Sequence, residues 1–245
     1  MVTSQSCCCP KPTVYNVKFH FRVYPASKIF HFLLSHRKYQ EEDSFVSPTC
    51  YNNNKKKKAG VRVKLDTCSA TVKFCRNFLV LRPECNKFVF TIFPRSGHVN
   101  VSGVKDFSLI PTVLDYFNTV FRTCVSLHKV VIDNSTASGY LQPTLTKLPQ
   151  LDFLNLRQLQ QYLVHSKAGI NLLDGQSKLK CHLSLRPHYF PGGVFKSDKS
   201  TCTVILFTSK KYIIVGAKCE REICETQKSL CAIITQSLKT NIQVT

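Results

Sequence analysis

Two stretches of the chain decide its fold: Thr91 Ile92 Phe93 followed by Val101 Ser102 Gly103 Val104 Lys105, and Ile205 Leu206 Phe207 followed by Ile214 Val215 Gly216 Ala217 Lys218. In both, an apolar run ends at a phenylalanine, a polar turn follows, and a second apolar run passes through a glycine to a lysine. Phe93 and Phe207 lie 114 positions apart, and Lys105 and Lys218 lie 113 apart. Such constant offsets indicate a duplicated domain, because the repeats of short-unit solenoids are only about 20–50 residues long.

The rest of the sequence shows the same order of elements twice. From Thr13 the first copy alternates polar and apolar residues, as a half-buried strand does, and apolar spacings of three and four indicate its helices. The elements predicted for the first copy are a strand from Thr13, a helix at Ala26–Lys38, strands at Val61–Leu65, Phe78–Leu81, Lys87–Phe93 and His98–Gly103, and a helix from Asp106 to about Val125. Those predicted for the second copy are a strand at Lys129–Asn134, a helix at Asn155–Lys167, strands at Leu179–Leu185, Gly193–Lys196, Thr201–Phe207 and Tyr212–Gly216, and a helix at Cys219–Leu238.

Strand and helix runs in this order predict an α+β fold. Two curved antiparallel units joined edge to edge would form one continuous sheet, with the helices on its convex face. We expect a disordered tail at 1–11, a first repeat at 12–127 with a basic loop insertion at 40–59, a second repeat at 128–240, and a tail at 241–245. The insertion carries Lys55–Lys58, which would suit either a nuclear localisation signal or a solvated basic loop.

The composition favours a polyanionic partner. The chain has 34 Lys and Arg against 14 Asp and Glu, a formal net charge of +20, and such a field attracts nucleic acid or an acidic membrane surface. No apolar run approaches the roughly 20 residues that span a bilayer, and Met1–Pro12 does not resemble a secretory signal. We therefore expect a protein that is not secreted and does not bind a membrane.

The 13 cysteines are expected to be reduced, because their number is odd and the chain is longer than small secreted domains. Cys219, Cys224 and Cys231 lack the paired spacing of zinc ligands and are expected to be small apolar residues, and Cys7–Cys9 are assigned to the tail. The sequence contains no glycine-rich phosphate loop and no recognisable nucleophile setting. We expect no catalytic residues, no metal and no cofactor.

Paired polar and aromatic residues suggest how the sheet would bind DNA. Asn16 and Asn134, 118 positions apart on equivalent strands, could donate to base acceptors near the centre of a minor groove. Phe93 and Phe207 each end a strand before a polar turn, and Phe190 also lies at a turn. Aromatic rings at the rim of a sheet can wedge into a base step and kink the duplex.

The stretch Tyr189 Phe190 Pro191 Gly192, together with the segments around Phe207 and Gly216, resembles the second repeat of the TATA-box-binding protein family. Pro12 Thr13 Val14 Tyr15 Asn16 is similar to the opening strand of that family's first repeat. The resemblance covers roughly Pro12 to Leu238 and is strongest from 186 to 222. It implies a saddle-shaped sheet that binds A·T-rich promoter DNA through the minor groove and bends it, as proteins of this family do.

Position by position, the resemblance implies that Phe190 and Phe207 are one wedge pair and that Phe93 belongs to the other, with Phe78 or Phe74 as its partner. The full set of expected DNA-binding residues is Asn16, Asn134, Phe78, Phe93, Phe190, Phe207, Ser102, Val215, Lys105 and Lys218. Ser102 and Val215 stand where the family has a hydroxyl near the dyad, and Val215 keeps only the apolar part of that contact.

Two departures from the family pattern bear on function. Arg186, Pro187, His188 and Tyr189 replace an acidic segment that engages transcription factor IIB, which reverses the local charge, and Lys210 replaces a turn glycine. The resemblance implies a transcription initiation factor, of a diverged form such as those encoded by large DNA viruses. It would act as a monomer on DNA, with transcription factors or the RNA polymerase machinery, in the nucleus or at a viral transcription site in the cytoplasm. The alternative is an accessory protein of the same fold that binds nucleic acid without regard to sequence, with a steep dependence on salt.

Overall fold

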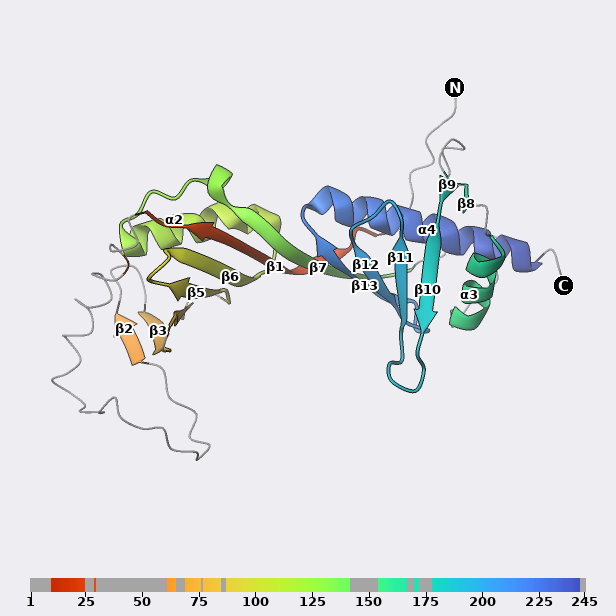
Figure 1. The fold of residues 1–245 in the computed structure, drawn as a ribbon, viewed down its shortest axis with the longest axis horizontal. Helices are drawn as coiled ribbons and strands as arrows, with labels where there is room; N and C mark the ends of the chain where they lie inside the picture. The colour runs from red at the N-terminus through yellow and green to blue at the C-terminus, as the bar shows by residue number, and fades with distance from the viewer. Residues whose placement is uncertain are drawn as a thin grey trace, which may run out of the picture. The chain divides into compact units, whose positions relative to one another are not determined.

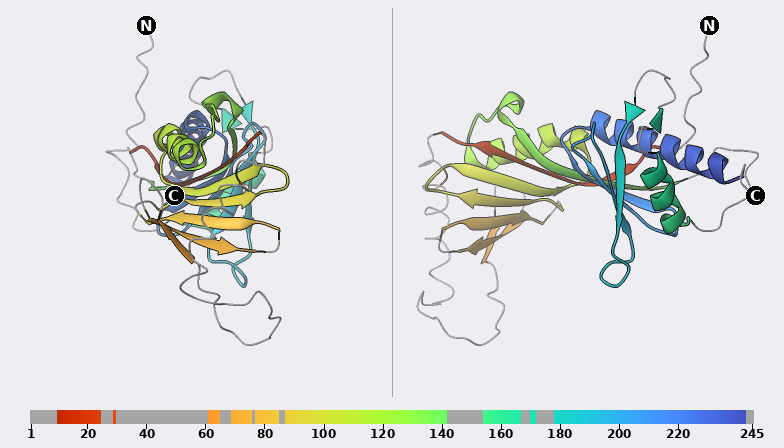
Figure 2. Two further views of the ribbon diagram at one scale, coloured as in Figure 1. Left: turned by 90° about the vertical axis from the view of Figure 1, so that its left-hand side faces the viewer. Right: turned by 45° about the vertical axis from the view of Figure 1, so that its right-hand side comes forward.

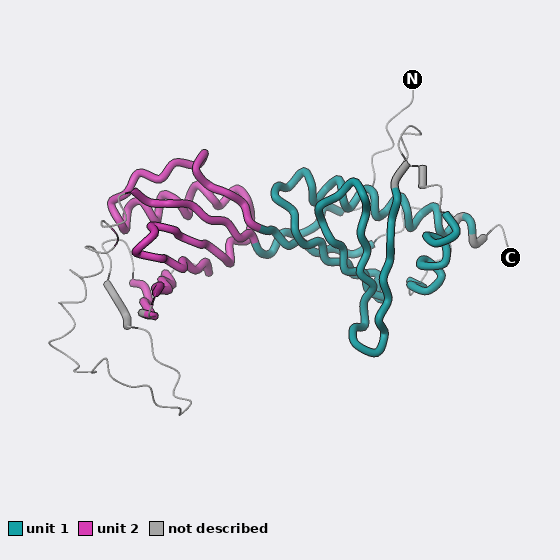
Figure 3. Tube along the Cα trace, viewed as in Figure 1, with its two compact units in different colours: residues 1–16, 134–245 teal, residues 17–133 magenta. Residues whose placement is uncertain are grey.

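The computed structural model describes residues 10–24, 29, 61–64, 69–75, 77–84, 87–141, 154–166, 170–171 and 178–242. The chain divides into two compact units, coloured separately in Figure 3. Unit 1 consists of residues 1–16 and 134–245, and unit 2 of residues 17–133. The two boundaries fall inside strands β1 and β7, so each of these strands is shared by both units.

Unit 2 is an antiparallel sheet with a helix against one face (Figures 1 and 2). Its strand order is β1-β6-β5-β4-β3-β2. The elements are β1 (Thr13–Arg22), β2 (Val61–Lys64), β3 (Ser69–Phe74), β4 (Leu79–Pro83), β5 (Val89–Phe93), β6 (His98–Val104), η1 (Phe107–Leu109), α2 (Ile110–Phe121) and η2 (Leu127–Lys129).

The core of unit 2 lies between this sheet and α2. Pro111 occupies the first turn of α2, where no intrahelical N–H is needed, and Arg122 ends the helix in a left-handed conformation with φ 49°. Phe117 of α2 is fully buried and meets Phe21 of β1 edge-on, with ring centroids 4.9 Å apart. Aromatic packing from both layers therefore fixes the sheet beneath the helix.

Unit 1 has the same plan. Its strand order is β10-β11-β12-β13-β7, with a separate two-stranded sheet of β8 and β9. Helices α3 and α4 pack on β10 and β13, and α4 runs along one face of the sheet in Figure 1. The elements are β7 (Val131–Tyr140), α3 (Leu156–His165), β8 (Ile170–Asn171), β9 (Lys178–Leu179), β10 (Cys181–Leu185), β11 (Gly193–Ser197), β12 (Thr203–Leu206), β13 (Lys211–Ala217) and α4 (Glu220–Ile242).

The antiparallel α+β architecture confirms the predicted fold class, and the boundaries of several elements need correction. Strand β3 was not predicted, although the buried Ala70 and Val72 alternate along it with Thr71 and Lys73. Strand β7 continues to Tyr140 through Ser, Thr and Gly residues that carry little apolar signal. The helix expected at 26–38, the insertion at 40–59 and Cys7–Cys9 lie outside the described residues, apart from the helical Ile29.

None of the helices in the described ranges is long and apolar enough to cross a membrane.

Candidate nucleic-acid interface

The strands of unit 1 present a second face that the helices do not cover. On β12 and β13 the buried side chains alternate with half-exposed ones, and burial follows the helix-packed face. The half-exposed side chains of these two strands are Thr203, Ile205, Lys211, Ile213 and Val215. The open face of unit 1 therefore carries mostly apolar, β-branched side chains and little charge. Such a surface suits contact with the shallow minor groove of a duplex better than it suits binding of a small ligand.

Phe190 and Phe207 lie together at one end of unit 1. Their ring centroids are 6.0 Å apart at an interplanar angle of 56°. Phe207 directly follows β12, and its N–H donates to the Lys211 carbonyl at 2.9 Å across the turn. Phe190, 36% exposed, is held by donation of its N–H to the Arg186 carbonyl at 2.9 Å. The structure therefore brings together the two rings that the sequence predicted as a pair.

A glycine allows this ring pair to form. A Cβ at Gly192 would lie 2.8 Å from Phe190 Cε1 and 3.2 Å from Phe207 Cε1. Such contacts are shorter than ordinary carbon–carbon packing distances of about 3.5–4.0 Å. Gly192 thus leaves the space in which both rings sit.

Unit 2 contains a second ring pair at the corresponding turn. Phe78 and Phe93 have centroids 5.7 Å apart at 43°. Phe78 directly precedes β4, and the Cys75 N–H donates to its carbonyl at 2.8 Å. The structure therefore brings Phe78 to Phe93, while the Phe74 side chain lies outside the described residues.

Asn134 has a fixed amide. Its Oδ1 accepts a hydrogen bond from the Gly216 N–H at 2.8 Å. Gly216, with φ +99°, lies at an irregularity in the β13–β7 pairing between Val215 and Ala217, and Gly103 has φ +84° at the equivalent place in β6. Since the oxygen is engaged, the Nδ2 end of Asn134 is the donor that a base acceptor could use.

The remaining residues that were predicted to bind DNA lie on β1, β6 and β13 or directly after them. Asn16 is half-buried on β1, Ser102 half-buried on β6 and Val215 half-buried on β13. Lys105 and Lys218 are exposed just after β6 and β13. The Lys218 N–H donates to Glu222 Oε2 at 2.8 Å, which fixes the backbone at the start of α4.

Sequence reasoning missed a cluster of polar side chains on unit 2. His20 Nδ1 lies 2.7 Å from Asp133 Oδ1, and His98 Nε2 lies 2.8 Å from Asn100 Oδ1. The two imidazole rings have centroids 4.8 Å apart. The alternation along β1 placed His20 on its polar side, but nothing in the sequence indicated that Asp133 would reach it.

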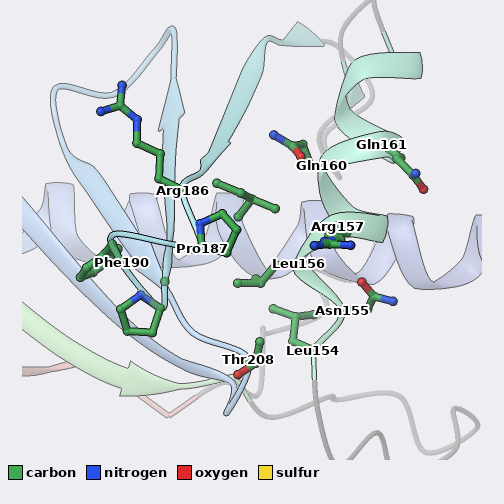
Figure 4. Close-up of a pocket in the computed structure, with 13 residues that line it drawn as sticks. Leu154, Asn155, Leu156, Arg157, Gln160, Gln161, Arg186, Pro187, Phe190 and Thr208 are labelled. Atoms are coloured by element: carbon green, nitrogen blue, oxygen red, sulfur yellow. The ribbon is translucent and has the colours of Figure 1, made fainter.

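A pocket of about 480 Å³ opens beside Phe190 (Figure 4). Leucines and prolines from α3 and from the β10–β11 connection line it, and Arg157 and Arg186 supply its two charged side chains. Asn155 caps α3 by accepting from the Gln158 N–H at 3.1 Å. The residues lining the pocket include no carboxylate, so its character is apolar and cationic.

Comparison with known proteins agrees with this geometry. Residues 163–237 match the family model described as transcription factor TFIID, or TATA-binding protein. Methanococcus jannaschii TBP is similar in structure, with a TM-score of 0.56 and 18% identity, over 93% of this chain and 99% of that chain. The chain therefore has a TBP-like fold, and its residues 163–237 match the TBP family in sequence.

No curated protein sequence matches this TBP-like chain. The structural match confirms the expected TBP-like α+β fold. The family model is that of a transcription factor and covers residues 163–237 of this chain.

Proposed function

We propose that this TBP-like protein is a transcription initiation factor that binds A·T-rich promoter DNA through the minor groove and bends it, acting as a monomer. The observation that carries the proposal is the presence of one phenylalanine pair in each unit. Phe190 with Phe207 and Phe78 with Phe93 lie at equivalent turns and have similar separations, 6.0 and 5.7 Å. Each of the two aromatic pairs could enter one base step, and the duplex would then be kinked at two places.

The energetic balance supports wedge insertion. Unstacking a base step costs a few kcal/mol, and the cost is recovered when the bent duplex contacts more protein surface. The rings in both pairs are only partly buried, so they can enter a step without unfolding the core. The net charge of +20 adds attraction for phosphate that does not depend on sequence.

The preference for A·T pairs would come from hydrogen-bond chemistry. In the minor groove both A·T orientations offer only acceptors, while G·C adds the guanine amino donor. Asn134 offers its Nδ2 donor because Gly216 occupies its oxygen. Asn16, at the equivalent place on β1, would supply the second donor, and Ser102 would add a hydroxyl.

Recruitment would use the pocket beside Phe190. Arg157 and Arg186 make this surface cationic, so a transcription factor or polymerase subunit that docks here needs an acidic surface. A protein with this role acts where transcription takes place, in the nucleus or at a viral transcription site. Replacing both arginines by glutamate would leave DNA bending intact and would remove recruitment of such a partner.

The proposal is tested by measuring binding and bending of end-labelled duplexes with A·T-rich or G·C-rich centres by fluorescence energy transfer. We expect tight, bent complexes only with A·T-rich DNA, and no bend for the double variant Phe190→Ala, Phe207→Ala. Leu127→Ala, which shortens an exposed apolar side chain in η2, is the matched control and should bend DNA normally. Equal affinity for G·C-rich DNA without a bend would refute the proposal and support a binder that ignores sequence.

A further inference from the structure

The histidine cluster of unit 2 lies on the open face of its sheet. Val17, Phe19 and Phe21 of β1 are fully or almost fully buried, so His20 points to the opposite side of the strand. On β6, His98 and Asn100 alternate in the same way with Val99 and Val101. Strand pairing places His20 opposite Asn100.

The cluster adjoins the proposed wedge. Strand pairing places His98 opposite Phe93, and the two rings have centroids 6.1 Å apart. The imidazole of His20 in turn lies 4.8 Å from that of His98, between centroids. A group bound in front of Phe93 would therefore also meet the two imidazoles.

The charges around the two histidines are mostly positive. On β1, Lys18 and Arg22 lie on the same side of the strand as His20. On β7, Asp133 forms a hydrogen bond with His20. On β5, the nearest open-face residues, Thr91 and Phe93, carry no charge. Asp133 is thus the one acidic neighbour among these residues. A polyanion bound on this face would supply the missing negative charge.

We propose that His20 and His98 form a DNA-contacting pair that binds the groove in its protonated form, so that unit 2 takes up a proton when DNA binds. This inference rests on the proposed function and goes further, since it assigns an additional contact and makes binding depend on pH. The phosphates on either side of the groove attract cationic side chains, and this attraction persists when the duplex is bent.

The proton uptake would come from unit 2 alone. At the repeat offsets of 118 and 113, Ser138 and Lys211 of unit 1 take the places of His20 and His98. Lysine carries its charge throughout the range in which histidine titrates, between about pH 5 and 8. The two halves of the interface would thus respond differently to pH, which gives the bound protein an orientation on an asymmetric site.

The sign of the pH effect follows from the proton balance. The complex holds more protons than the separated protein and DNA, so affinity is greatest at low pH and falls as pH rises. Uptake of one full proton would raise the dissociation constant about tenfold per pH unit. Because histidine is already partly protonated in the free protein within this range, we expect an uptake of about half a proton on average, and a rise of about tenfold between about pH 6 and pH 8 at constant ionic strength.

The test is fluorescence anisotropy with a labelled duplex that has an A·T-rich centre, across this pH range. We expect the wild type to show the tenfold change and His20→Gln, His98→Gln to show a nearly constant affinity. The control is His182→Gln, His188→Gln, which removes two exposed histidines of unit 1 and should keep the full pH dependence. A second readout on the wild type is the NMR shift of the His20 and His98 ring protons, expected to move toward the protonated form when DNA is added.

The inference is overturned if the His20, His98 variant keeps the wild-type pH dependence, or if the ring protons do not move. It is also overturned if the wild type bends A·T-rich DNA with an affinity independent of pH, a result that leaves the proposed function standing. A wild type that neither prefers nor bends A·T-rich DNA at any pH would instead refute the proposed function.

Discussion

Gly192→Ala should separate the packing of the ring pair from the stability of the fold. The added methyl group would sit 2.8 Å from Phe190 Cε1 and 3.2 Å from both Phe207 Cε1 and the Leu206 carbonyl oxygen. To restore a contact of about 3.5 Å, the Phe190 ring must retreat by about 0.7 Å. Because Phe190 is 36% exposed, it can turn toward solvent.

The expected loss of stability is therefore at the low end for overpacking, about 1 kcal/mol, or a fall in melting temperature of about 2–4 °C. The effect on DNA should be larger, since the displaced ring no longer pairs with Phe207 for insertion. We expect affinity for A·T-rich DNA to fall by about ten- to a hundredfold, which corresponds to about 1.4–2.8 kcal/mol, with a smaller bend angle.

The assay combines thermal melting with the fluorescence bending measurement. Gly193→Ala is the matched control, because the atoms nearest to its Cβ would be leucine atoms, Leu183 Cδ1 at 2.7 Å and Leu185 Cδ2 at 2.8 Å. It should lose stability but bend DNA normally at temperatures where it is folded. Wild-type bending by Gly192→Ala, or an equal loss of bending by the control, would refute the reasoning.

Three further predictions concern single side chains. Asn134→Asp keeps an acceptor for the Gly216 N–H, so the free energy of unfolding, measured with urea, should change by less than about 1 kcal/mol. DNA binding, measured by anisotropy, should weaken at least about tenfold because a carboxylate replaces the amide donor. An unchanged affinity would exclude Asn134 from the interface. Phe117→Ala removes a fully buried ring of α2 and should cost about 3–5 kcal/mol in urea unfolding, whereas a loss below about 1 kcal/mol would contradict its place in the core. Burial raises the pKa of the Cys181 thiol to about 12, so little thiolate forms at neutral pH. Cys181 should therefore react with iodoacetamide much more slowly than the exposed Cys124. Mass mapping of alkylated peptides would compare the two rates, and equal rates would contradict the prediction.

Strands with a strong period-2 pattern were predicted within a few residues, since each turns large apolar side chains to the core. This holds for β5, β6, β12 and β13. The second half of β7 was missed because Ala, Ser, Thr and Gly carry a weak apolar signal. Strand β3 was missed although Ala70 and Val72 alternate with Thr71 and Lys73 along it. Their places are decided by pairing with neighbouring strands.

Some residues of the candidate site could also be predicted from the sequence, and others could not. The phenylalanines at the ends of β5 and β12 could be found from the repeat, because an internal duplication puts equivalent residues at equivalent turns. The partner of Phe93 was less well defined: Phe78 was the expected residue and Phe74 the fallback, because Phe78 lies 15 residues before Phe93 where the second repeat has 17. The ring contact of Phe78 with Phe93 depends on how the β3–β4 connection closes.

The sequence by itself determined the duplication, the α+β class and the matching Asn and Phe positions, because strand and helix periods are written in residues close together in the chain. Only the tertiary structure decided which polar side chains meet. His20 and Asp133 are 113 positions apart and lie 2.7 Å apart in space. Asn134 and Gly216 are 82 positions apart and share a hydrogen bond. Such pairs have no periodic signature, since they form where strands distant in sequence are brought side by side by the packing of the core.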